Sequence, residues 1–436
     1  MSIEERKGKA ILSVNSCFFC LPLGHFDTKA PMKTGCGQLT EGKRFDYNAG
    51  INQLFQGGGY RMANIVDYIA WRGDIPLTQV PLGEVDSLIL AYLSYMPFDG
   101  IVPPGVTGTR TRLSEAALAL VERHRCEGIQ LAYTIGDSNE ADCALLEALS
   151  KSVRFADIGL FGYVDHYDRE GQEQFSAVAF ELPDGSVYIG FRGTDSTVVG
   201  WKENFNMSFE DEVPAQRDAV AYTEAVYDAL KRPLYLGGHS KGGNLAVYAG
   251  MFVREDVRSA IVQAYSFDGP GFNELIAASP EFTSLDGRVH TYVPQSSLVG
   301  ILMWHSEPFT IIRSDSVSVF QHDVYTWQLM GGSFLKVEER TDASRFADRA
   351  LKTWLADLSP EQKESFVNGI YTVISAGKGK NLDNLLEGRS LLAMLKALGT
   401  LDDKTRSDVQ DAIRSLGDAF RETAAELIER NTQDLA

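Results

Sequence analysis

The stretch Leu234-Tyr-Leu-Gly-Gly-His-Ser240-Lys-Gly-Gly-Asn-Leu-Ala-Val-Tyr248 joins a short apolar run to a segment of helical composition. Within it, Gly238, Ser240 and Gly242 match the pattern G-x-S-x-G, which places a nucleophilic serine on a sharp turn between a strand and a helix. Both glycines are needed because a Cβ two residues before or after the serine would crowd that turn. A Gly-rich turn that only packs a helix on a strand is the alternative.

The segments around this motif predict alternating strands and helices. Residues 155–167, 173–182 and 186–191 are strand-like, and Pro183-Asp184-Gly185 is a turn signal between the last two. A helical period follows over 215–230, and strand and helix keep alternating to about residue 330. This order predicts an α/β-hydrolase fold with a mostly parallel sheet, whose core spans residues 151–335.

Helical segments flank the predicted core. Residues 62–150 and 336–436 both show helical spacing, and Ser359-Pro360-Glu361-Gln362 has the residue types of a helix start. A leucine stripe comprises Leu382, Leu385, Leu386, Leu392 and Leu395. We expect the C-terminal region to pack on the core as a helical cap, and a separate partner-binding module is the alternative.

The first 61 residues differ from the rest. They hold three of the five cysteines and no convincing hydrophobic period, and their apolar stretch lacks the cleavage pattern of a signal peptide. Cys17 and Cys20 form a lone pair with no second half of a metal site. We interpret residues 1–61 as a non-native or disordered N-terminal extension, with Met62 as the natural start.

Composition limits the classes of partner. The formal net charge of −18 opposes binding to nucleic acid, and no apolar run approaches the ~20 residues needed to span a bilayer. Scattered cysteines suggest a reducing, cytoplasmic location. No ligand spacing indicates a metal, and no phosphate-binding or dinucleotide fingerprint indicates a cofactor. Composition leaves the oligomeric state open.

A second motif precedes the serine in the chain. Gly190-Phe-Arg-Gly-Thr-Asp-Ser196 ends a predicted strand, and Trp201 follows it. With Gly238–Gly243, this segment resembles class 3 lipases, which have an F-R-G-[ST] strand end and a G-H-S-x-G-G elbow. The resemblance implies that backbone N–H groups of Thr194 and Lys241 form the oxyanion hole. Arg192 is expected to form a structural ion pair. The Lys241 side chain either pairs with a carboxylate or binds an acidic group of the substrate.

A closer resemblance extends over about residues 62–335. It is carried by Met62-Ala-Asn-Ile-Val-Asp-Tyr-Ile-Ala-Trp-Arg-Gly-Asp74, Gly238-His-Ser-Lys-Gly-Gly-Asn244, Phe267-Asp-Gly-Pro-Gly271, Tyr292-Val-Pro-Gln-Ser-Ser297 and Gln321-His-Asp323. Together these motifs resemble the DUF2974 proteins, a bacterial family of lipase-like hydrolases. The resemblance implies the fold and a serine nucleophile, and it brings no established substrate.

A serine nucleophile needs a histidine base, which follows the last strand in this architecture. Residues 309–313 read as that strand, and His322 lies in the polar loop after it. His305 is the alternative base. His290 lies inside a predicted strand and is interpreted as structural, whereas His239 is expected to point away from the cleft.

The acid that orients the base is harder to place. Class 3 lipases have an aspartate after the seventh strand, where this chain has Pro294-Gln295-Ser296-Ser297. Asp268, after the predicted sixth strand, is the natural substitute, with Asp315 and Asp323 as alternatives. The alternative role of Asp268 is to cap the turn at Gly269-Pro270-Gly271.

These residues predict a serine esterase or lipase that cleaves small-molecule or lipid esters through an acyl-enzyme on Ser240, without a cofactor. A protease or a thioesterase would use the same residues. The alternative from another class is a non-catalytic acyl-binding or scaffolding protein on a hydrolase fold. Residues 197–214 are a candidate lid, with packing under the sheet edge as the other interpretation.

Overall fold

The structure is a computed structural model. It describes residues 62–132, 138–168, 173–194, 206–207, 210, 212–285, 287–375, 399 and 401–433. The chain divides into two units, Met1–Arg61 and Met62–Ala436, and all described residues lie in the second. The predicted extension over residues 1–61 and the leucine stripe at 382–395 lie outside the described residues.

An eight-stranded sheet forms the centre of the second unit, and its strands are ordered β1 to β8 as in the chain. The strands are β1 (Thr111–Arg112), β2 (Gly159–Asp168), β3 (Glu173–Glu181), β4 (Val187–Phe191), β5 (Leu234–His239), β6 (Ile261–Phe267), β7 (Val289–Pro294) and β8 (Phe309–Ile312). Strands β1 to β4 pair antiparallel, and β4 to β8 pair parallel. The predicted α/β-hydrolase fold with a mostly parallel sheet is therefore confirmed.

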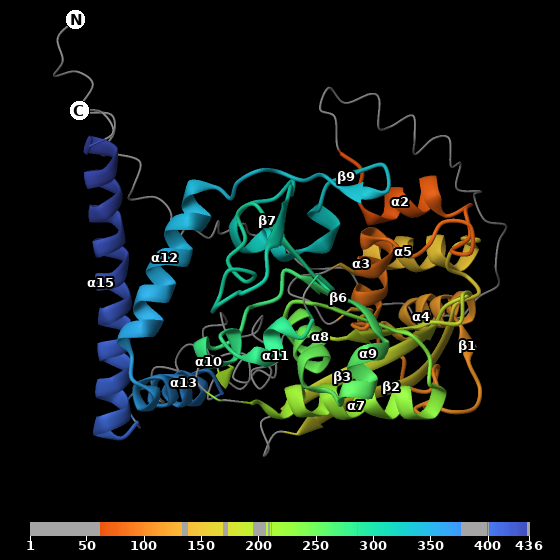
Figure 1. Ribbon diagram of the computed structural model, residues 1–436, viewed down its shortest axis with the longest axis horizontal. Coiled ribbons are helices and arrows are strands. Elements are labelled where there is room, and N and C mark those ends of the chain that lie inside the picture. Colours follow the sequence, from red (N-terminus) through yellow and green to blue (C-terminus); the bar gives the residue numbers. More distant parts are fainter. Residues whose placement is uncertain are drawn as a thin grey trace, which may run out of the picture. The chain divides into compact units, whose positions relative to one another are not determined.

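Each face of the sheet buries a separate hydrophobic core, because alternate residues of a strand point to opposite faces. Along β3, Val178 and Phe180 join the core under the N-terminal helices, whereas Ala177 and Ala179 join the core under the crossover helices. The strands thus lie between α3 (Glu84–Leu93) on one side and α7 (Pro214–Leu230) on the other (Figure 1). The parallel strands place their carboxyl ends at one edge of the sheet.

The remaining helices before β8 agree with the expected helical segments. They are α2 (Ile65–Arg72), α4 (Leu113–Glu127), α5 (Asn139–Lys151), α8 (Lys241–Phe252), α9 (Glu255–Ala260), α10 (Glu274–Ala277) and α11 (Pro280–Thr283). Two details differ from the sequence-based prediction. The strand expected from residue 155 begins at Gly159, because the preceding residues form turns, and β1 lies inside the segment expected to be helical.

The chain after β8 forms short elements and then helices. The short elements are the 3-10 helices η2 (Ser318–His322) and η3 (Val324–Thr326), and strands β9 (Leu329–Met330) and β10 (Ser333–Phe334). The helices are α12 (Asp342–Asp357), α13 (Pro360–Ser375) and α15 (Asp403–Gln433). Before α13, Ser359 and Gln362 exchange side-chain hydrogen bonds with each other's backbone N–H, which confirms the expected helix start.

Helix α12 contacts both the sheet and the C-terminal helices. Ala347 packs with Val293 and Ile301 of the sheet region, and Trp354 donates a hydrogen bond to the carbonyl of Ala412 in α15. The division of the chain into a core and flanking helical regions remains a prediction. No helix in the described ranges has the length and apolar character needed to cross a membrane.

Candidate functional site

Ser240 lies between β5 and α8 in a backbone conformation that L-residues rarely adopt, with φ 59° and ψ −134°. The glycines around it permit this turn. A Cβ on Gly238 would overlap the backbone of Gly242, and a Cβ on Gly242 would overlap the backbone of Phe191. The strain holds the buried serine at the carboxyl edge of the sheet, as expected for a nucleophile turn.

The end of β4 lies against the serine turn. A Cβ on Gly193 would lie 2.6 Å from the carbonyl oxygen of His239 and 2.9 Å from Cβ of Ser240. Thr194 follows, and the described residues include no hydrogen-bond partner for its buried hydroxyl oxygen. The structure therefore brings the residue before Thr194 against the serine turn, and Lys241, the other predicted oxyanion residue, directly follows Ser240.

Two cations beside the serine turn have polar partners. Arg192 forms a two-pronged pair with Asp165 of β2, with N–O distances of 3.0 Å and 2.7 Å, which confirms the expected ion pair. The ammonium group of Lys241 is buried and donates a hydrogen bond to the carbonyl of Gln174, 2.7 Å away. The Lys241 side chain is thus anchored on β3.

Asp268 and His322 meet at the same edge of the sheet. Nδ1 of His322 lies 2.6 Å from Oδ2 of Asp268, which is 1% exposed. Oδ1 of Asp268 accepts hydrogen bonds from the Ser297 hydroxyl at 2.5 Å and the Gly300 N–H at 3.1 Å. Three donors thus converge on this buried carboxylate, which fixes the orientation of the His322 ring.

The β-strand register explains why Asp268 lies near the serine. His239 pairs with Phe267 across β5 and β6, and the Ser240 N–H donates to the carbonyl of Phe267, 2.9 Å away. The next residues on the two strands are therefore Ser240 and Asp268. Ser297, which follows β7 where class 3 lipases have an acid, here binds the carboxylate of β6 instead.

The alternative residues have other partners. His305 Nδ1 lies 3.1 Å from Glu307, and His290 stacks on Tyr265 with ring centres 5.3 Å apart. Burial raises the pKa of Glu307, but hydrogen bonds from His305 and Thr291 outweigh it and hold that pKa below its ordinary value. His305 thus has a carboxylate partner of its own, Glu307.

The alternative acids have local partners. Asp315 accepts a hydrogen bond from Gln328, and Asp323 accepts one from the N–H of Tyr325, where it caps η3. Burial raises the pKa of Asp323. The His322 ring pairs with Asp268 instead, at 2.6 Å.

His239 and Tyr95 are site residues whose roles sequence reasoning missed. Nε2 of His239 lies 2.9 Å from the carbonyl oxygen of His322, and the two rings lie 4.3 Å apart. The Tyr95 hydroxyl lies 3.1 Å from Nδ1 of His239. His239 thus contacts the base segment, whereas the sequence predicted only that it points away from the cleft; Tyr95 gave no sequence signal.

The N-terminal helices also hold the segment that follows His322. Asn64 donates to the carbonyl of Tyr325, and the Tyr325 hydroxyl donates to Asp142, 2.7 Å away. Asp142 also accepts a hydrogen bond from Tyr92. Burial raises the pKa of Asp142, so these hydroxyl donors compensate for its lost solvation.

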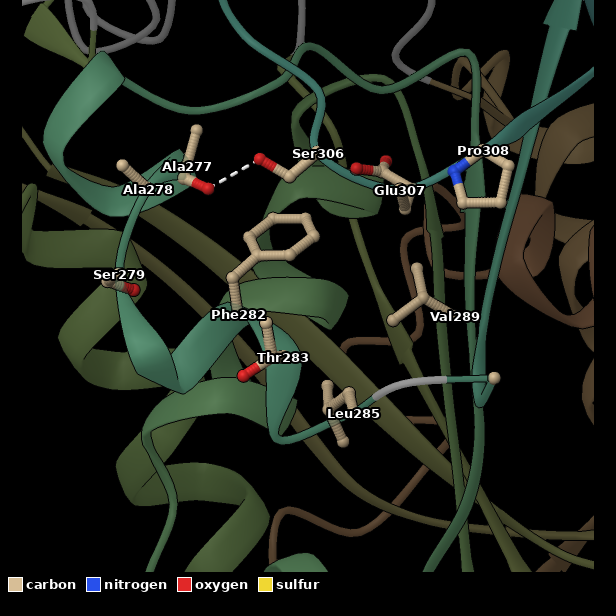
Figure 2. Close-up of a pocket in the computed structure, with 11 residues that line it drawn as sticks. Ala277, Ala278, Ser279, Phe282, Thr283, Leu285, Val289, Ser306, Glu307 and Pro308 are labelled. Atoms are coloured by element: carbon tan, nitrogen blue, oxygen red, sulfur yellow. Dashed lines mark hydrogen bonds between the residues drawn. The ribbon is translucent and has the colours of Figure 1, made fainter.

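A pocket of about 200 Å³ lies elsewhere, next to the amino ends of β7 and β8. Figure 2 shows Phe282 and Leu285 facing Val289 and Pro308 across it, with the Glu307 carboxylate above the Phe282 ring. The serine turn lies at the carboxyl ends of the strands, so this pocket is separate from the candidate site.

Among the described side chains, no group of three or more His, Cys, Asp or Glu could hold a metal ion. Most of the candidate lid at 197–214 lies outside the described residues.

A family comparison agrees with the resemblance seen in the motifs. The family model described as Mbeg1-like, that of the DUF2974 lipase-like proteins, matches residues 149–372. A solved structure of the Rhizomucor miehei lipase propeptide complex is 15% identical, with a TM-score of 0.30, over 41% of this chain and 70% of that chain. No curated protein matches the sequence.

Proposed function

Because the chain belongs to the Mbeg1-like family of lipase-like proteins, we propose that it is a serine hydrolase of the esterase or lipase type. The observation that carries the proposal is the 2.6 Å contact between His322 Nδ1 and Asp268 Oδ2 beside the strained Ser240 turn. A histidine oriented by a buried carboxylate next to a serine on such a turn is the arrangement that activates a hydroxyl nucleophile.

The proposed reaction begins with attack of Ser240 Oγ on the carbonyl carbon of a carboxylic ester. Nδ1 of His322 donates to Asp268, so its Nε2 has the free lone pair that accepts the serine proton. Asp268 then stabilises the imidazolium that forms. The alcohol leaves with the proton from His322, and water activated by the same histidine releases the acid from the acyl-enzyme.

The oxyanion of each tetrahedral intermediate would lie between the backbone N–H groups of Thr194 and Lys241. The close approach of Gly193 to Ser240 supports this placement, since a methyl group there would lie 2.9 Å from the serine Cβ. Removing one such donor typically slows an enzyme by about 10²- to 10³-fold. The unpartnered Thr194 hydroxyl, judged over the described residues, supports a donor role on the same side.

The substrate class is a small-molecule or lipid carboxylic ester. A panel of p-nitrophenyl acetate, butyrate and palmitate tests it, with Ser240→Ala as the inactive variant. Ser150→Ala, on α5, is the matched control because that hydroxyl donates to a carbonyl of its own helix, that of Glu147. We expect hydrolysis by the wild type and by Ser150→Ala alone. Equal hydrolysis by Ser240→Ala would overturn the proposal, and no hydrolysis of any ester would favour the non-catalytic alternative.

A further inference from the structure

His239 is held between Tyr95 and the main chain of His322. Its Nε2 lies 2.9 Å from the His322 carbonyl oxygen, and its Nδ1 lies 3.1 Å from the Tyr95 hydroxyl. The rings of the two histidines are tilted by 33°, with centres 4.3 Å apart. His239 therefore connects the residue before the nucleophile to the residue that acts as base.

These contacts specify one tautomer of His239. A carbonyl oxygen only accepts hydrogen bonds, so Nε2 must carry the proton. Nδ1 is then an acceptor for the Tyr95 hydroxyl, whose oxygen also lies 3.1 Å from a second acceptor, the carbonyl oxygen of His239. Burial and the neighbouring His322 hold the pKa of His239 well below its ordinary value, so the ring is neutral at pH 7.

Tyr95 also touches the other half of the site. A Cβ on Gly193 would overlap the Tyr95 hydroxyl, which therefore lies in direct reach of the oxyanion turn. The carbonyl that precedes His322 is fixed as well, since Trp327 Nε1 donates to the carbonyl of Gln321 at 2.7 Å. Two consecutive carbonyls of the base segment thus have ring N–H donors.

We propose that His239 and Tyr95 are positioning residues, which hold the backbone of His322 so that its ring faces Ser240. Asp268 fixes the ring through Nδ1, and His239 fixes the main chain through its carbonyl oxygen. The inference rests on the proposed role of His322 as base. A displacement of about 1 Å between reacting groups can slow a reaction by about 10²-fold, so a single main-chain hydrogen bond has a measurable effect.

The neutral state of His239 also favours proton transfer to His322. His322 becomes an imidazolium when it accepts the serine proton. A second cation 4.3 Å away would oppose that step, because unit charges at such a distance repel by several kcal/mol in a protein interior. The Tyr95 hydroxyl, 3.1 Å from Nδ1, can donate to the neutral ring.

The kinetic experiment compares His239→Leu with His239→Gln. Leucine removes the donor, whereas glutamine keeps an N–H at the position of Nε2. We expect phosphonylation by a fluorophosphonate to slow by about 10- to 100-fold in His239→Leu and by less than about 5-fold in His239→Gln. Tyr95→Phe should fall between them. His290→Leu, a histidine of β7 remote from the serine, should match the wild type. Equal rates for His239→Leu and wild type, or equal impairment in both His239 variants, would overturn the inference.

A spectroscopic readout separates this inference from the proposed function. Long-range ¹H–¹⁵N spectra of the wild type should show the Nε2–H tautomer at His239. The Nδ1 proton of His322, bonded to Asp268, should shift or broaden in His239→Leu and persist in His239→Gln. A wild-type protein that never labels would refute the proposed hydrolase while these spectra still decide the positioning role. An Nδ1–H tautomer at His239, or an unchanged His322 proton in His239→Leu, would refute the positioning role alone.

Discussion

Asp268→Asn is the substitution with the most sharply defined outcome. Asp268 accepts hydrogen bonds from His322, the Ser297 hydroxyl and the Gly300 N–H. An asparagine offers one oxygen and one NH₂ group to these three donors. If the NH₂ group faces His322, the ring must turn its acceptor nitrogen toward it, and Nε2 then carries the proton and cannot accept one from Ser240.

The expected loss of activity follows from this wrong tautomer. Replacing the acid of a serine–histidine–acid triad by its amide lowers kcat by about 10⁴-fold. At about 1.36 kcal/mol for each tenfold change, the barrier rises by roughly 5 kcal/mol. The fold should persist, because Asp268 has φ 50° and asparagine tolerates this left-handed conformation. Alanine is the poorer test, since it would add a backbone penalty of about 1–2 kcal/mol.

The assay measures kcat/KM for a p-nitrophenyl ester, with a thermal melt to verify folding. Asp315→Asn is the matched control, since Asp315 bonds Gln328 rather than the base. We expect Asp315→Asn to stay within about threefold of the wild type, far from the 10⁴-fold loss in Asp268→Asn. Activity of Asp268→Asn within tenfold of the wild type would refute the assignment of the acid.

Three further predictions concern backbone strain, close packing and pH. Ser240→Gly should be about 1 kcal/mol more stable than Ser240→Ala in urea unfolding, because glycine relieves the strain at φ 59°; equal stability would contradict the strain. Gly193→Ala should lose at least 100-fold in activity and about 1–3 kcal/mol in stability, because the added methyl group overlaps Tyr95. The control Gly332→Ala should change neither activity nor stability, because the space around Gly332 is open. The pKa of His239 is lower in the folded than in the unfolded chain, so below about pH 6.5 the unfolded chain binds a proton that the folded chain does not. The free energy of unfolding therefore falls as the pH is lowered through this range, by up to about 1.4 kcal/mol per pH unit. His239→Gln should flatten this slope, and parallel profiles for the two proteins would contradict the assignment.

The sequence predicted much of the architecture because local patterns specify it. Residues 186–191 and 234–236 are apolar runs bounded by glycine, proline or polar residues, and both form neighbouring parallel strands. In a parallel sheet the residues after each strand meet at one edge, which is why Ser240 and Asp268, far apart in the chain, become neighbours. The boundaries that differed, such as the start of β2 at Gly159, depend on turns that hydrophobic periodicity does not report.

The rest of the site depends on contacts between distant segments. Tyr95 follows an apolar helix and lies 144 residues before His239, so no local pattern distinguishes it from a core tyrosine. Asp142 looks like an ordinary first-turn acid of α5, yet it accepts hydrogen bonds from Tyr92 and Tyr325. The lack of an acid after β7 is visible in the sequence, but the hydrogen bond from Ser297 to Asp268 joins two strand ends that no local pattern links.

The most direct test of the central claim is intact-mass analysis of the folded protein after treatment with a fluorophosphonate, followed by peptide mapping. We expect one phosphonyl group per chain, attached to Ser240, absent in Ser240→Ala and formed far more slowly in His322→Ala. An unmodified folded protein, a group attached to another residue, or equal labelling of His322→Ala would contradict the assignment of Ser240 and His322 as nucleophile and base.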